Sequence, residues 1–166
     1  LQEEEVILAA NSSLHEGYLP YTTNNIIRSA FKFYDAVYGW GGLQNSVDCS
    51  SFISNAYRTV GIFLPRNADE QETSAGIHKK MGNMSSAQRA NVVKSLTPGS
   101  TLHMDGHVML YLGSSNEVPY AIHSLGSHYT GGTRHSVMKV VVSDLELQKS
   151  NGNTYRDELT TCVTFR

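Results

Sequence analysis

The stretch Ser100–Leu125, STLHMDGHVMLYLGSSNEVPYAIHSL, decides the fold class of this 166-residue chain. Its apolar residues follow a period of two, which is typical of strands, and turn-forming residues interrupt them twice. The stretch predicts strands at Ser100–Met104, His107–Leu112 and Tyr120–Leu125. The same pattern downstream predicts two further strands, at Val137–Val142 and Leu159–Phe165.

Helical patterns precede these strands. Apolar residues recur with helical spacing from Ile27 to Val37, after candidate N-caps beginning at Thr22, and again from Cys49 to Val60, where Gly61 ends the pattern. Shorter helices are predicted at 69–78 and 85–95. Helices followed by strands with short turns favour an α+β fold, in which helices pack on a central antiparallel β-sheet.

Composition narrows the function classes. The chain has 13 Lys and Arg against 15 Asp and Glu, a formal charge of −2, with 40% hydrophobic residues. This composition excludes disorder for most of the chain and offers no basic excess for nucleic acid. No apolar run reaches the roughly 18 residues that a membrane span needs. We expect residues 1–20 to be a lead-in, or the tail of an upstream region, and residues 21–166 to form one domain.

Two histidines fall on neighbouring predicted strands. His107 and His123 are equidistant from Ser115, the middle of the intervening turn. In an antiparallel hairpin with that centre, the two residues would lie opposite each other on one face, about 4.5–5.5 Å apart at Cβ. One imidazole could then hydrogen-bond the other. A slip of one residue would separate them onto opposite faces.

Cys49 lies where the second helix begins, directly after Asp48. Unpaired N–H groups and the helix dipole favour a thiolate there, and a thiolate is a nucleophile. Cys49, His107 and His123 could therefore act as nucleophile, base and orienting group. Sequence spacing does not establish that the helix end reaches the strand.

Interpretations without a catalytic role remain open for each of these residues. Cys49 could be an ordinary buried cysteine, or it could form a disulfide with Cys162, which also suits a small core residue. The histidines could be surface or core residues. His103 and His107 have the spacing of zinc ligands on a helix, but the turn between them argues against that geometry.

Three separated blocks keep the order and spacing of a known pattern. They are Tyr38-Gly39-Trp40-Gly41-Gly42, then Asp48-Cys49-Ser50-Ser51-Phe52, then the run from Gly61 through Leu64-Pro65-Arg66 to Gln71. Together they resemble the NlpC-type family of bacterial cell-wall cysteine peptidases. The strands around His107 and His123 are similar to those that carry the family's base and third polar residue.

The resemblance implies a papain-like α+β fold and hydrolysis of peptidoglycan stem peptides, in many members between γ-D-glutamate and a diamino acid. It implies catalytic roles for Cys49, His107 and His123. It also implies a substrate-binding pocket with Tyr38 beside the thiol and with Asp48 and Ser50 near a free N-terminal L-alanine amine. We expect a structural role for Arg66. Ser51 replaces the family's usual glycine, and we expect its side chain to narrow the cleft.

The resemblance implies no cofactor and a secreted or cell-envelope location, where the partner is a stem peptide or muropeptide. The segment from Gly17 to Thr22 resembles members that follow Src-homology-3-like wall-binding domains. Two alternatives remain at this level: an N-acetylmuramoyl-L-alanine amidase of the same fold, and a catalytically silent wall-binding module. Residues 126–166 carry no recognisable functional pattern.

Overall fold

The computed structural model describes residues 15–41 and 46–165. A six-stranded antiparallel sheet runs in the order β1-β6-β2-β3-β4-β5. Its strands are β1 (Ile77–Lys80), β2 (Thr101–Met104), β3 (His107–Ser115), β4 (Val118–Thr130), β5 (Thr133–Asp144) and β6 (Leu159–Thr164). The helices are α1 (Thr23–Phe31), α2 (Cys49–Arg58), α3 (Ala68–Glu72), α4 (Ser86–Lys94) and α5 (Tyr155–Glu158). The expected α+β architecture is confirmed.

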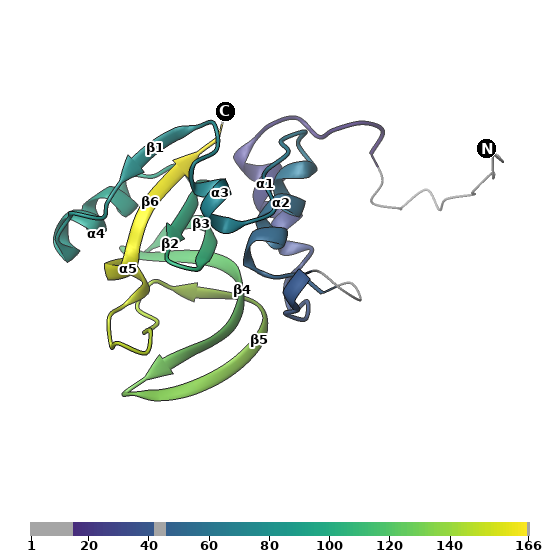
Figure 1. Ribbon diagram of the computed structural model, residues 1–166. Coiled ribbons are helices and arrows are strands. Elements are labelled where there is room, and N and C mark those ends of the chain that lie inside the picture. Colours follow the sequence, from purple (N-terminus) through teal and green to yellow (C-terminus); the bar gives the residue numbers. More distant parts are fainter. Residues whose placement is uncertain (1–14, 42–45, 166) are drawn as a thin grey trace.

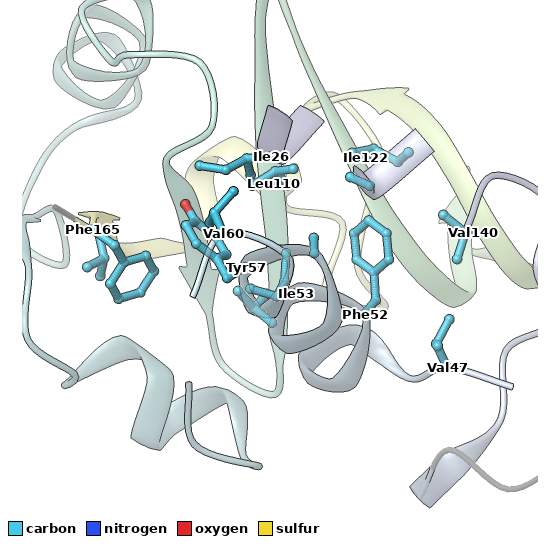
Figure 2. Packing of buried hydrophobic residues seen from close by; sticks show 14 residues of the cluster. Ile26, Val47, Phe52, Ile53, Tyr57, Val60, Leu110, Ile122, Val140 and Phe165 are labelled. Carbon is cyan, nitrogen blue, oxygen red and sulfur yellow. The ribbon is translucent and has the colours of Figure 1, made fainter. Parts of the chain in front are cut away.

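Both faces of the central strands are covered (Figure 1). Helices α1 and α2 pack on one face, where Phe52 and Ile53 form one core with Leu110 and Ile122 of the sheet (Figure 2). Val108 belongs to the same core. A second core on the opposite face joins alternating residues of the same strands to α4, α5 and the segment before β6. Its sheet residues include Leu102, Met109, Tyr111, Ala121 and Cys162. Because both faces are buried, the alternation along β3 assigns each side chain to one of two cores.

Helix α2 confirms its prediction closely, whereas α1 is shorter than predicted. Beyond Phe31 the chain turns, and Asp35 adopts a left-handed φ of 66°. The following segment pairs with the edge strand instead: the Asp35 N–H donates to the Val140 carbonyl at 3.0 Å, and the Val140 N–H donates to Ala36 at 2.9 Å. This pairing satisfies backbone N–H and C=O groups at the edge of β5, which a longer helix α1 would leave to solvent.

The helix predicted at 69–78 is wrong in its second half. Helix α3 ends at Glu72, and Ile77–Lys80 forms the edge strand β1, paired with β6. The helix predicted at 85–95 is confirmed as α4, which Ser85 caps through a hydrogen bond from Gln88 N–H. Sequence periodicity over four edge residues carries too little signal to reveal a strand that exists only through its pairing partner.

The predicted hairpin register is wrong by two residues. The turn is centred on Asn116 and Glu117, both with positive φ, and a bulge lies between Tyr111 and Gly113. Leu110 consequently pairs with Ile122. Carried toward the start of β3, this register sets His107 two residues out of line with His123. An even displacement keeps both side chains on one face.

The lead-in is described only from residue 15 onward; residues 1–14 lie outside the described chain. Leu19 joins it to the domain, because its N–H donates to the carbonyl of Thr59 just after α2 at 2.9 Å. Within residues 15–41 and 46–165, no helix is long and apolar enough to cross a membrane.

Candidate active site

Cys49 is the first residue of α2, and the N-terminus of this helix is tightly organised. Asp48 is the N-cap: its Oδ1 accepts a hydrogen bond from Ser51 N–H at 2.9 Å, while Ser51 Oγ accepts one from Asp48 N–H at 2.9 Å. This reciprocal capping box satisfies two otherwise unpaired donors. It fixes the direction in which the Cys49 side chain leaves the helix.

The capping box also corrects the expectation for Ser51. Its hydroxyl is turned back onto the backbone of Asp48 and is not among the groups that line the neighbouring cavity. Ser51 therefore does not narrow the cleft. A glycine at this position could not close the second half of the capping box, because it has no side-chain acceptor.

The Cys49 thiol is half-buried near the start of β3, where the Val108 N–H interacts with the sulfur and favours the thiolate. Burial raises the pKa of Cys49, and the Asp48 carboxylate raises it further. The hydrogen bonds from Val108 and from the first amides of α2 act in the opposite direction but are outweighed. The amides of the helix N-terminus lower the pKa of Cys49, as predicted. The net shift of that pKa is nevertheless upward, which is the reverse of the expectation.

His107 and His123 are hydrogen-bonded to each other. His107 Nε2 lies 2.8 Å from His123 Nδ1, with the ring centroids 5.1 Å apart. His107 directly precedes Val108, whose N–H interacts with the Cys49 sulfur, so the start of α2 lies near the start of β3. The two histidines that the sequence predicted to pair are thus in contact, and the helix end that carries Cys49 lies near the strand end that carries His107.

The chain of hydrogen bonds continues to a residue that the sequence did not reveal. His123 is fully buried, and its Nε2 lies 3.0 Å from Ser143 Oγ on β5. When His123 donates to Ser143 through Nε2, its Nδ1 is free to accept from His107 Nε2–H. That arrangement leaves Nδ1 as the basic atom of His107.

Burial lowers the pKa of His107 to about 4, and the nearby charges of Lys149 and His103 act in the same direction. Burial also lowers the pKa of His123, as does the charge of His107. These pKa shifts favour a neutral thiol beside neutral imidazoles at neutral pH over a preformed thiolate–imidazolium pair.

Tyr155 is a further residue that packs against both histidines. Its buried ring packs edge-on against both imidazoles, with centroid distances of 6.0 Å to His107 and 6.1 Å to His123. Neither Tyr155 nor Ser143 has a sequence signal, because each is brought to the histidines only by strand pairing and by the return of the chain through α5.

The expected pocket residues Tyr38, Asp48 and Ser50 line a cavity of about 650 Å³ together with Cys49. Burial raises the pKa of Tyr38, and the charges of Cys49 and Asp48 raise it further; the phenol and the thiol belong to residues that line the same cavity. The wall also includes Trp40, Arg66 and the carboxylates Asp69, Glu72 and Asp105. With Asp48, four carboxylates face one guanidinium, so this cavity is acidic.

Arg66 organises the wall of the cavity. It forms an ion pair with Asp48, and its Nη1 donates to Ser50 Oγ at 2.9 Å. Burial raises the pKa of Asp48, but hydrogen bonds from Arg66, Ser51 and Gly41 outweigh burial and lower it to about 2. The structural role expected for Arg66 agrees with these contacts.

The alternative interpretations fare less well. Cys49 and Cys162 are both free thiols, and Cys162 is a buried core residue whose sulfur lies 3.9 Å from that of Met81. His103 is buried and bonded to Thr101 Oγ1 at 2.9 Å. In the part of the chain that the structure describes, no three His, Cys, Asp or Glu side chains gather closely enough to hold a metal ion.

Comparison with known proteins assigns the chain to a family. The NlpC/P60 family pattern matches residues 35–154, and no curated protein sequence gives a match. A structure of an NlpC/P60 endopeptidase from Photobacterium damselae subsp. piscicida is similar with a TM-score of 0.70 at 19% identity, covering 83% of this chain and 37% of that one.

Two further structures have the same fold. The peptidoglycan hydrolase RipB from Mycobacterium tuberculosis gives a TM-score of 0.58 at 22% identity, over 86% of this chain and 63% of its own. The NlpC/p60 domain of the peptidoglycan hydrolase SagA gives 0.57 at 20% identity, over 87% of this chain and 100% of that domain. The chain thus spans a little over a third of the first of these proteins and under two thirds of the second. With the family pattern matched over most of its length and the fold shared, this chain belongs to the NlpC/P60 family.

Proposed function

We propose that this protein is a cysteine peptidase that hydrolyses peptidoglycan stem peptides at the bond between γ-D-glutamate and the diamino acid, on substrates with a free N-terminal L-alanine. The observation that carries the proposal is the hydrogen-bonded pair His107–His123 at the start of β3, next to Val108, whose amide favours the thiolate form of Cys49. Family membership and the peptidoglycan hydrolases among its structural neighbours support the substrate class. The same substrate implies action in the cell envelope or outside the cell.

The reaction begins with both partners neutral. His107 takes the Cys49 proton at Nδ1 as the sulfur attacks the γ-carbonyl carbon of D-glutamate. The C–S bond forms and the carbonyl π electrons move to oxygen. His123 accepts the hydrogen bond from His107 Nε2–H and stabilises the resulting imidazolium, and Ser143 holds the ring of His123 in turn.

The developing oxyanion needs donors that are already in place. The Cys49 N–H at the start of α2 is one, and the Tyr38 hydroxyl beside the sulfur is the second. One such donor contributes about 2.7–4 kcal/mol to transition-state stabilisation. As the C–N bond breaks, the imidazolium of His107 protonates the departing amine. A water activated by the same ring then hydrolyses the thioester.

The acidic cavity suits a peptide with a free ammonium end. Asp48 and Ser50 lie on its wall, as the resemblance implies. The Asp48 oxygens already accept hydrogen bonds from Arg66, Ser51 and Gly41. We therefore assign the attraction for ammonium to the combined field of the cavity's carboxylates, with Asp48 as its most buried member.

The test uses the tripeptide L-Ala-γ-D-Glu-meso-diaminopimelate and mass spectrometry of the products. We expect L-Ala-D-Glu and free diaminopimelate. Cys49→Ala should abolish turnover and keep the circular dichroism spectrum of the wild type. Cys162→Ala is the matched control, since it removes the other thiol and leaves the site intact.

Four results would contradict the proposal. Turnover by Cys49→Ala would remove the nucleophile, and cleavage between L-Ala and D-Glu would give the wrong bond. Release of the intact peptide from a muropeptide, with no cleavage within the stem, would identify an amidase instead. A protein that binds the tripeptide without cutting it would be the silent wall-binding module.

A further inference from the structure

A second cavity lies across the β2–β3 turn from the one that holds Cys49. It measures about 230 Å³. The turn residues Met104, Asp105 and Gly106 line both cavities, whereas Cys49 lines only the first and His107 lines only the second. The nucleophile and the base thus mark two adjoining compartments that share one wall.

This arrangement assigns the second cavity a place in the reaction, given the proposed function. The group that protonates a departing amine must be within hydrogen-bond reach of it. The residue on the leaving side of the scissile bond must therefore lie against His107. The acyl side, with its free ammonium, occupies the acidic cavity beside Cys49.

The second cavity is lined by a positively charged side chain, that of Lys149. Gln148 and Ser150 of the same loop also line this cavity. Among the residues that the structure describes, Lys149 Nζ makes only long contacts, at 3.4 Å to the Asp105 carbonyl and 3.9 Å to Glu158 Oε2. Glu158 already accepts hydrogen bonds from Asn151 and Asn153. The ammonium of Lys149 thus retains capacity for a further acceptor.

The loop that carries Lys149 is firmly attached to the sheet. Tyr129 N–H of β4 donates to the Gln148 carbonyl at 2.9 Å, and Lys149 N–H donates to the Asn153 carbonyl at 3.0 Å. The side chain of Lys149 is 27% exposed. Because hydrogen bonds hold this loop, the Lys149 ammonium at the mouth of the cavity is already in position when a ligand binds. This reduces the entropy cost of binding.

We propose that this cavity receives the leaving diamino acid and that Lys149 pairs with a carboxylate of that residue. Asp105, on the shared wall, supplies the opposite charge for an ammonium group. The side chain of meso-diaminopimelate ends in both a carboxylate and an ammonium, whereas that of L-lysine ends in an ammonium alone. Pairing with the side-chain carboxylate would favour meso-diaminopimelate over L-lysine, whereas pairing with the α-carboxylate would favour neither.

The experiment measures kcat/KM on peptides that differ in one carboxylate. The peptides are L-Ala-γ-D-Glu-meso-diaminopimelate, its side-chain carboxamide, its α-carboxamide and the L-lysine analogue. We expect one carboxamide to be cut about tenfold more slowly than the acid, as loss of one charge-assisted contact implies. Which carboxamide it is distinguishes the side-chain carboxylate from the α-carboxylate as the partner.

Variants tie that discrimination to Lys149. In Lys149→Gln the ratio of kcat/KM for acid and carboxamide should fall to within about twofold of unity, while Lys149→Arg should keep most of it. Lys94→Gln is the matched control, because Lys94 also makes a 3.9 Å ion pair but lines neither cavity. A mere positioning role for Lys149 would slow all four peptides alike and leave the ratio unchanged.

A binding measurement separates this inference from the proposed function. Calorimetry with Cys49→Ala and the uncut peptides should show the acid binding about tenfold tighter than the discriminating carboxamide, and this difference should vanish in Cys49→Ala/Lys149→Gln. Equal affinities, or a ratio that survives Lys149→Gln, would overturn the role of Lys149. Absence of turnover by the wild type would instead overturn the proposed peptidase and leave the binding result to decide the cavity.

Discussion

The ion pair between Asp48 and Arg66 gives a stability prediction with a definite magnitude. Asp48→Asn keeps a side-chain oxygen that can accept the N-cap hydrogen bond from Ser51 N–H, but it removes the charge facing Arg66. Asp48 is almost fully buried, with its side chain 4% exposed. The substitution therefore tests the charge and spares the cap.

The magnitude follows from the pKa of Asp48, which falls from 3.8 to about 2 in the folded protein. That shift corresponds to about 2.4 kcal/mol at neutral pH. Arg66 is 47% exposed, and solvent screens it in part, so we expect Asp48→Asn to lower the free energy of unfolding by about 2 kcal/mol at pH 7. For a domain of this size that lowers Tm by roughly 4–8 °C.

The sign of the pH dependence is fixed by the direction of the shift. A depressed carboxyl pKa contributes its full stability above the unfolded value of 3.8, and the contribution is lost as pH falls toward 2. The gap between wild type and Asp48→Asn should accordingly shrink to about 1 kcal/mol at pH 3. Urea unfolding at pH 7 and pH 3 measures both gaps, and Arg66→Gln with the double variant closes the thermodynamic cycle.

Two results would refute this reasoning. A difference below about 0.5 kcal/mol at pH 7 would mean that desolvation cancels the ion pair. A difference that stays constant from pH 7 to pH 3 would mean that the lost stability does not come from the carboxylate charge.

Three further predictions concern the chemistry. Because burial raises the pKa of Cys49, alkylation by iodoacetamide should accelerate about tenfold per pH unit between pH 6 and 8; a rate independent of pH there would indicate a resting ion pair. His107→Ala should abolish peptide turnover, whereas His123→Ala should reduce kcat by a smaller factor, since it only orients the base; equal losses would show that the two act as one unit. Ser143→Ala should lower kcat several-fold with KM little changed and Ser143→Thr should restore it, while a change confined to KM would place Ser143 at the substrate instead.

Local sequence was sufficient for the elements with strong, uninterrupted patterns. The apolar face of α2 and the Gly61 stop predicted that helix within two residues, and the alternation from Ser100 onward predicted the central strands. Edge elements were less predictable. The strand Ile77–Lys80 and the chain segment at Asp35–Tyr38 owe their conformation to pairing with β6 and β5, which no local pattern records.

The sequence by itself identified the chemical groups of the site. The blocks around Tyr38, Cys49 and Leu64 identified the family pattern, and the hairpin between His107 and His123 placed both imidazoles on one face. That conclusion survived a two-residue error in register because side chains alternate with period two.

Only the tertiary structure decided how these groups act together. Packing of α2 on the sheet brings the Cys49 sulfur to the Val108 amide, and strand pairing adds Ser143 behind His123. The same burial reverses the pKa direction that the helix N-terminus alone would give to Cys49, since desolvation depends on every atom packed around the thiol and not on its neighbours in sequence. The loop at Lys149 has no recognisable sequence pattern. It lines the same cavity as His107 only because the chain returns across the face of the sheet opposite α1 and α2.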